Sequence, residues 1–181
     1  LFVVLFLLFI GSAQTVIYGQ ETDELRVKGA IFKVQASSTA IVSGSTTALN
    51  NYNSGTVKIE ASGTLTAEGN VTNESSSSIQ IDGQLNVKGN WTNNATASVA
   101  LAGATTGTVE FQGSAAQTIG GTASTVFENL TINNAWGVNL SANQTVNTQL
   151  TFSAGIISTG ANRLDLTAAT DGTSGYGTGK Y

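Results

Sequence analysis

The sequence contains no cysteine, histidine, proline or methionine among its 181 residues, and only 10% of its residues are charged. Without cysteine the chain can form no disulfide, thiolate metal site, cysteine nucleophile or lipid-modified cysteine. Without histidine it lacks the side chain that most often serves as a general base at neutral pH. The net charge of −4 and the isoelectric point near 4.6 provide no basic surface to neutralise phosphates, so we expect no nucleic-acid partner.

An apolar run opens the chain. Residues 1–10 read LFVVLFLLFI, and the small residues of 11–13 follow before Gln14. The run is about half the length that a membrane-spanning helix needs, and small residues at this point are typical of a signal-peptidase site. We therefore expect a signal peptide over 1–13 with cleavage near Ala13/Gln14, and a secreted or cell-surface mature chain without a membrane span.

What the sequence does have is strand-like alternation that repeats. Residues 63–73 (GTLTAEGNVTN) and 83–93 (GQLNVKGNWTN) match at an offset of 20, with apolar residues at every second position. This period is that of a strand, and no helical pattern separates the copies. The sequence thus predicts an all-β fold, a parallel β-solenoid (β-helix) of roughly seven coils with about 20 residues each. The general rule for parallel crossovers makes the coil right-handed.

The same spacing aligns the rest of the first half. Leu25 and Val27 are assigned to the positions of Leu65 and Ala67, and the glycines at 44, 63, 83 and 103 mark successive coils. The apolar pair before each glycine is aligned as well: Ala40 and Val42, Ile59 and Ala61, Ile79 and Ile81, Val99 and Leu101. The stretch 45–55 (STTALNNYNSG) loses the alternation, so a loop is expected there.

The second half repeats in a different register. Residues 109–111, 130–132 and 150–152 form one ladder at offsets of 21 and 20, and 138–140, 156–157 and 164–166 mark further strands. After the signal peptide we expect a lead-in or cap over 14–24, first-register coils over 25–106, second-register coils over 107–169, and a Gly-rich tail over 170–181. We expect the natural chain to continue past this tail, so that the last coil is open and associates end to end with another molecule.

Individual side chains receive positions from this register. The inward, buried set is predicted to include Leu65, Leu85, Val87, Trp91, Ile79 and Ile81, with Leu65 and Leu85 in adjacent coils. Outward, Glu68 and Lys88 share a position and are expected to pair. Asn73 and Asn93 are expected at a turn, where their side chains can hydrogen-bond along the stack.

Catalytic chemistry finds little support in the pattern. The eleven acids recur in no fixed position, Arg26 and Arg163 are far apart, and no GGxGxD calcium repeat is present. Polysaccharide-cleaving β-helices need several carboxylates on one face. We therefore expect no catalytic residue, no cofactor and no metal site, although a fragment of a polysaccharide lyase or hydrolase remains the enzymatic alternative. Ice binding is a weaker alternative, because Gln84 and Asn86 break the rank that Thr64 and Thr66 begin.

Trp136 is the one candidate binding residue. It lies in the turn-like stretch NNAWG (133–137), where the pattern predicts exposure. An exposed indole on a rigid rod can stack on a sugar ring, so a carbohydrate-binding module is a further alternative. Packing at a coil edge would explain the residue equally well.

The stretch 109–166 resembles the repeat of large exported surface proteins of bacteria. Three elements carry the resemblance: the F-x-G and Q-x-I opening within 111–120, NLTINN at 129–134, and G-x-I-x-T-G at 155–160. The resemblance implies an adhesin-like cell-surface module of parallel β-helix coils and transfers no catalytic residue. The function expected is a non-catalytic stalk of a larger exported protein, with surface glycans or host and matrix proteins as candidate partners.

Overall fold

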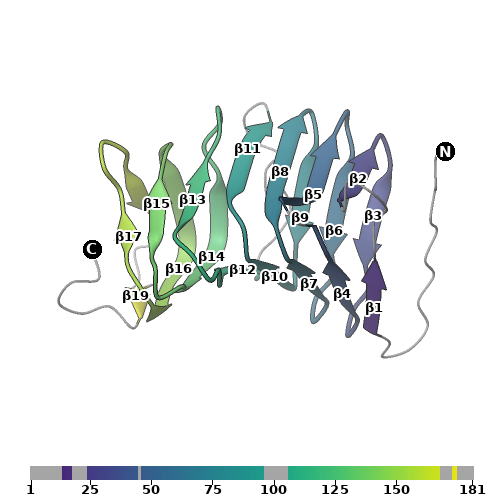
Figure 1. Cartoon of the computed structure of the whole chain (residues 1–181), viewed down its shortest axis with the longest axis horizontal. Helices are drawn as coiled ribbons and strands as arrows, with labels where there is room; N and C mark the ends of the chain where they lie inside the picture. Colours follow the sequence, from purple (N-terminus) through teal and green to yellow (C-terminus); the bar gives the residue numbers. More distant parts are fainter. Residues whose placement is uncertain (1–13, 18–23, 45, 96–105, 168–172, 175–181) are drawn as a thin grey trace.

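The computed structural model describes residues 14–17, 24–44, 46–95, 106–167 and 173–174, and this part contains strands and no helix. Every strand pair in it is parallel. The strands stack along one axis, from β1, β2 and β3 at one end to β17 at the other (Figure 1). The predicted fold class, a parallel β-solenoid, is confirmed.

Three sheets form the sides of the stack, and we call them faces A, B and C. Face A contains β1 (Gln14–Ile17), β4 (Thr39–Val42), β7 (Thr64–Ala67), β10 (Gln84–Val87), β12 (Thr108–Phe111), β14 (Val126–Asn133), β16 (Gln144–Ala154), β18 (Leu164–Leu166) and β19 (Thr173–Ser174). Face B contains β2 (Leu25–Lys28), β5 (Thr47–Tyr52), β8 (Asn70–Ser75), β11 (Trp91–Ala95), β13 (Gln117–Gly120), β15 (Val138–Leu140) and β17 (Ile157–Ser158). Face C contains β3 (Ile31–Val34), β6 (Thr56–Ile59) and β9 (Ser78–Ile81).

The change of register in the second half has a structural cause. In the early coils the chain passes through a strand on face C and then a strand on face A before it returns to face B. For example, β6 on face C and β7 on face A lie between β5 and β8 on face B. Later coils replace these two strands by one long strand, β14 or β16, whose pairing shifts between Phe127 and Asn129. The predicted ladder of 109–111, 130–132 and 150–152 is confirmed as the face A portion of these strands.

Inward side chains form columns, that is, sets of partner positions in successive coils. One column on face A consists of Ala40, Leu65, Leu85, Val109, Leu130 and Leu150, all of them buried. Burying a side chain of the size of Leu is worth about 1.5–3 kcal/mol, so each coil stabilises itself by covering the next. All six residues predicted to be buried are in the core.

Three aromatic rings pack together in the core. Trp91 and Phe127 have ring centroids 5.9 Å apart, and Phe111 meets Phe127 edge-on at 6.3 Å. The indole N–H of Trp91 donates to Thr125 Oγ1 at 2.9 Å, which satisfies the polar end of a fully buried ring. The core position predicted for Trp91 is therefore confirmed.

The stretch 45–55 is not a loop, and that prediction was wrong. Residues 47–52 form β5, which lies between β2 and β8 on face B, with Ala48, Leu49 and Asn51 buried. Two features hid the alternation: a register shift between Thr47 and Leu49, and an inward position occupied by the polar Asn51.

The alignment of Leu25 with Leu65 is also wrong. Leu25 pairs with Leu49 on face B, whereas Leu65 pairs with Ala40 on face A. The faces carry the same alternation of apolar and polar residues, so the pattern alone does not say which face a strand belongs to.

Coil length varies around the expected value of about 20 residues. Thr39 pairs with Thr64, 25 residues later, and Thr64 with Gln84, 20 residues later. All three corners contribute to this difference of five residues: 43–46 against 68–69 between faces A and B, 53–55 against 76–77 between B and C, and 60–63 against 82–83 between C and A. The corner between C and A alone is two residues longer in the first case. For this reason Ile81 pairs with Ile59, and Ile79 with Val57, instead of with Ala61 and Ile59. The segment around Gly103 lies outside the described residues.

Two other predictions involve the ends of the chain. The expected signal peptide (1–13) and most of the Gly-rich tail (170–181) lie outside the described residues. Within the expected lead-in (14–24), β1 already belongs to face A, where it pairs with β4.

Candidate functional site

Charged side chains are scattered over the described surface. The ion pairs are Arg26 with Glu24, Lys33 and Lys58 with Glu60, Lys88 with Glu68, and Arg163 with Asp165. The predicted pair of Glu68 and Lys88 is confirmed, with an N–O distance of 2.8 Å. Among the described residues no three carboxylates, histidines or cysteines come close enough to hold a metal ion.

The most concentrated of these charges surrounds Glu60. Lys33 and Lys58 occupy partner positions on face C, and their ammonium groups lie 2.9 and 3.2 Å from the same Glu60 oxygen. Hydrogen bonds from Lys33 and then Lys58 hold the pKa of the Glu60 carboxyl below its ordinary value. The carboxylate offsets the repulsion between two stacked cations, so its role in this arrangement is structural.

Asparagines form a second polar arrangement, inside the stack. The Asn51 amide donates to Asn73 Oδ1 at 2.9 Å, and the Asn73 amide donates to Asn93 Oδ1 at 3.4 Å. All three are buried within strands β5, β8 and β11. The predicted bonding along the stack is confirmed, but the expected turn position of Asn73 and Asn93 was wrong. A strand can hold them because each amide is bonded to its neighbour in the next coil.

A third arrangement fixes the corner between faces A and B in the later coils. Gln117, which is buried, accepts the N–H of Gly113 at 2.8 Å and an amide proton of Asn134 at 2.9 Å. Its own amide donates to the carbonyls of Val87, at 3.0 Å, and Gly89. These contacts tie together three consecutive coils.

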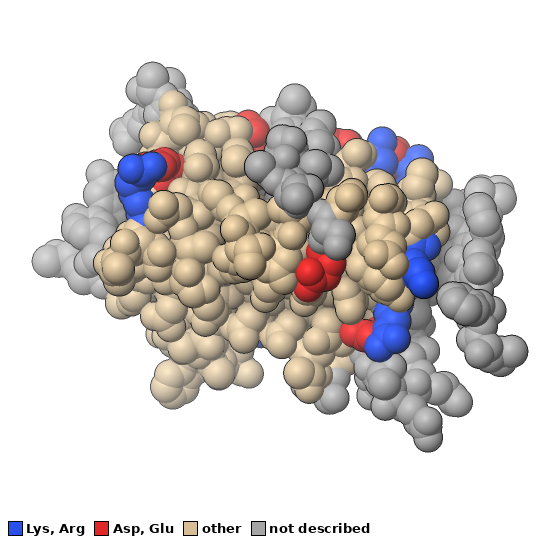
Figure 2. Space-filling model, turned by 90° about the horizontal axis from the view of Figure 1, so that it is seen from above, with Lys and Arg blue, Asp and Glu red and all other residues tan. Residues whose placement is uncertain are grey.

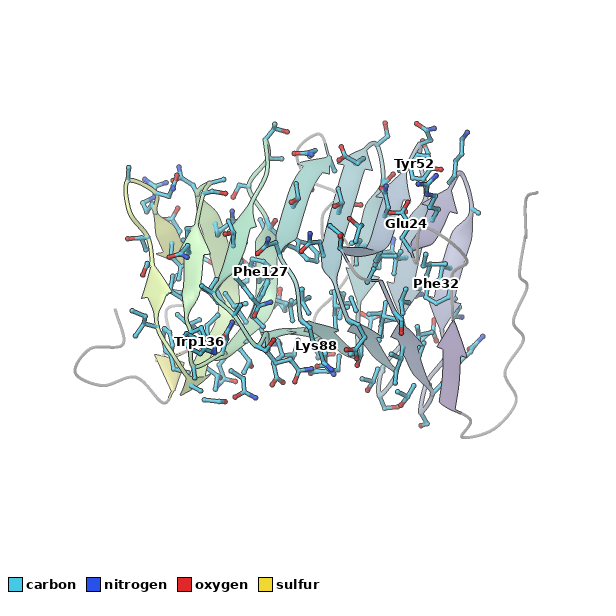
Figure 3. All side chains as sticks on the ribbon, in the orientation of Figure 1. Glu24, Phe32, Tyr52, Lys88, Phe127 and Trp136 are labelled. Carbon is cyan, nitrogen blue, oxygen red and sulfur yellow. The ribbon has the colours of Figure 1, made fainter. Side chains whose placement is uncertain are left out.

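Trp136 lies on this corner, between β14 and β15, toward the C-terminal end of the stack (Figure 3). The residue is 71% exposed, which confirms the predicted exposure and argues against coil-edge packing as its main role. The backbone beneath it is fixed, because the N–H of Trp136 donates to Asn134 Oδ1 at 2.9 Å and that of Gly137 to the Asn134 carbonyl at 2.8 Å. Asn134, itself buried, also donates to the Ala115 carbonyl at 2.7 Å.

The neighbouring coils place small residues beside the indole. Gln117 pairs with Val138, and Val138 with Ile157. The backbone hydrogen bonds extend into the preceding corner, where the N–H of Gln117 donates to the carbonyl of Gly137 and the N–H of Val138 donates to the carbonyl of Ile156. The offset of 21 between these coils puts Ala115 beside Trp136 in the preceding coil. In the following coil only residues 155–156 correspond to 134–137, and Gly155 lies against Asn134, so Trp136 is in a turn that projects beyond that coil.

Sequence reasoning found Trp136 but missed the residues that shape its surroundings. Neither Asn134 nor Gln117 stands out in an Asn-rich and Gln-containing chain. The signal available was the doubled Asn of 133–134 directly before an exposed aromatic. The small residue Ala115 could be recognised as a neighbour of Trp136, and Gly155 as a neighbour of Asn134, only once the register was known.

The structure also places the threonines considered for ice binding and the arginines considered for catalysis. Thr64 pairs with Gln84 and Thr66 with Asn86, so the threonine rank is broken as predicted. Figure 2 shows the larger groups of lysine and arginine near the two ends of the stack. Arg26 and Arg163 are near opposite ends, in β2 and directly before β18.

Comparison with protein-family models, with curated proteins and with solved structures finds no match. A search of the described residues for a helix able to cross a membrane finds none. The site and its surroundings therefore provide the evidence for function.

Proposed function

We propose that this chain is a non-catalytic module of an exported cell-surface protein, a stiff β-solenoid that serves as a stalk or an adhesive surface. One observation carries the proposal: the recurring polar side chains bond to the neighbouring coils instead of converging on a common point. The inner column of Asn51, Asn73 and Asn93 is the main example.

Stiffness follows from the direction of the bonds. In a parallel ladder the backbone hydrogen bonds run along the axis of the stack, and the core columns run in the same direction. Stretching or bending the rod would therefore require breaking bonds on several faces at once. Export is supported by the apolar run of 1–10 and the small residues after it.

The experiment has two arms. The purified chain is incubated with neutral and uronate polysaccharides, and release of new sugar ends is measured. In parallel, intact cells of the source organism are labelled with an antibody to the chain, before and after treatment with an external protease. We expect no product release and a surface label that the protease removes.

Release of sugar products above the level of a heat-unfolded sample would overturn the non-catalytic assignment. A label that appears only after the cells are broken would overturn the surface location.

A further inference from the structure

We infer that the corner around Trp136 is a binding site for an uncharged polysaccharide whose pyranose rings present C–H faces, such as a β-linked glucan. The inference deepens the proposed adhesive role by naming the ligand class, and it rests on that role. It starts from an exposed indole on a corner that is otherwise made of small residues.

The indole is held where a ligand can reach it. Its neighbour in the preceding coil is Ala115, and the following coil has only residues 155–156 where this coil has 134–137. The next column contains Ala116, Gly137 and Ile156. Ala115 and Ala116 are exposed, and Ile156 is 38% exposed. Because these side chains are short or absent beside Trp136, a flat ring can approach the indole without displacing protein atoms.

The corner is also preorganised. Gly155 has a φ of +84° and lies so close to Asn134 that a Cβ would overlap the Asn134 carbonyl oxygen. Gly137, with a φ of +81°, continues the turn on the other side of Trp136. A rigid aromatic platform loses little conformational freedom when a ligand binds, which favours stacking on it.

The surrounding charge favours a neutral ligand. Residues 106–162 contain no lysine or arginine, and their acids are Glu110 and Glu128. Both carboxylates accept hydrogen bonds from neighbouring coils, Glu110 from Gln84 and Asn133, and Glu128 from Asn147 and Thr148. Lys88, which holds the position of Gln112 in the preceding coil, is paired with Glu68. An acidic polysaccharide would therefore find no unpaired cation here, and a cationic ligand would find carboxylates that are already bonded.

Polar side chains with free bonding capacity lie on both sides of the corner. Gln112 and Ser153 flank it toward face A, and Asn139 flanks it toward face B. Within the described part of the chain none of these three side chains makes a hydrogen bond. They can therefore donate to and accept from the hydroxyl groups at the edge of a sugar ring, while the indole covers its face.

The alternative occupant, a second copy of this chain, fits less well. A stable protein interface buries about 800 Å² on each partner. The indole exposes at most about 200 Å², and its neighbours are alanines, glycines and a half-buried isoleucine. The corner is too small for a dimer and suits one or two stacked sugar rings.

The test uses affinity electrophoresis of the folded chain in gels that contain hydroxyethylcellulose, lichenan or xyloglucan, with alginate as a charged control. We expect at least one neutral polymer to retard the chain, and alginate to leave it unretarded. Trp136→Ala should weaken the binding about tenfold or more. The matched control is Ile31→Ala, because Ile31 is 73% exposed at the other end of the stack.

The chain supplies its own second readout. It has two tryptophans, and Trp91 is fully buried, so a change in iodide quenching on addition of the neutral polymer reports on Trp136. Three outcomes would overturn the inference: no retardation by any of the three neutral polymers, equal retardation of the Trp136→Ala variant, or self-association that this variant abolishes while the polymers have no effect. None of these outcomes bears on the proposed stalk role. Release of sugar products would instead overturn the proposed non-catalytic function without contradicting the binding site.

Discussion

Single residues in this solenoid act on their nearest neighbours in the coils above and below. Leu85 illustrates this, because it lies between Leu65 and Val109 in the core column of face A and is fully buried. At the surface, Glu60 likewise acts on its neighbours, because it pairs with Lys33 and Lys58. The energetic effect of a substitution should therefore depend on whether its column faces inward or outward.

Leu85→Asp should unfold the stack. A carboxylate at this position would have no cationic partner in its column, and burying an unpaired charge costs several kcal/mol. Circular dichroism during urea titration measures the loss. Thr92→Asp, at an outward position of β11, is the control and should leave the midpoint nearly unchanged. A Leu85→Asp chain with the midpoint of the original chain would contradict the assigned register.

Glu60 should make stability depend on pH. The pKa of its carboxyl is lowered in the folded chain by hydrogen bonds from Lys33 and Lys58. A lowered pKa gives stability that is fully present above the unfolded-state value and is lost as the pH falls through the folded value. Thermal melts of the original chain and of Glu60→Gln should therefore differ at neutral pH and converge in acid. Melting curves that stay equally far apart at every pH would show that the carboxylate charge is not responsible.

At the scale of whole strands, β5, β8 and β11 depend on one another through their buried asparagines. Asn51, Asn73 and Asn93 lie in one inward column, each in a different strand of face B. A polar column of this kind fixes the register, because a strand that slipped by one residue would bury an unpaired amide.

Asn73→Ala should destabilise the chain by about 1–3 kcal/mol. It removes the acceptor of one Asn51 amide proton, although that amide still donates to the Ser78 carbonyl, and it removes the donor to the Ser77 carbonyl and to Asn93 Oδ1. Urea titration measures the difference, and Asn139→Ala serves as a comparison, because this exposed asparagine of β15 makes no side-chain hydrogen bond within the described part of the chain. A double variant, Asn51→Ala with Asn73→Ala, tests whether the two side chains are coupled. If its loss in free energy of unfolding is no smaller than the sum of the losses in the two single variants, they are not coupled.

The same column shows where sequence reasoning succeeds and fails. Leu65 and Leu85 were assigned correctly because apolar residues at every second position indicate a strand with one buried side. Asn51 was misread as part of a loop, since a polar residue in an inward position is acceptable only if a neighbouring coil bonds it. Trp136 was recognised as exposed from its turn, but its neighbour Ala115 depends on a register that only the structure supplies.

The whole molecule is close to one-dimensional, because each strand pairs only with the strands of the coils next to it. Stability in such a stack is approximately a sum over coils and over the contacts between them. Coils in the middle have a neighbour on each side, while those near the ends have one. Opening should therefore begin at the ends and proceed inward.

Hydrogen exchange should show this gradient. Amides of β7 and β10 are expected to exchange more slowly than those of β3 and β17, which lie at the edges of their sheets. Exchange followed by mass spectrometry resolves these segments. Equal protection of all four strands would mean that the stack opens as a single unit.

The unequal corners between faces C and A have a consequence for how such a chain can change. The ladder between β7 and β10 stays in register although the corner before β7 has four residues, 60–63, and that before β10 has two, 82–83. An insertion at 60–63 would therefore lengthen a surface loop, at a cost that rises by only about 0.6 kcal/mol for each doubling of its length. One extra residue inside β10 would instead turn every later side chain of that strand to the opposite side. Chain length in this protein is thus free to drift at the corners, where new sequence can be displayed, and is held constant along the faces.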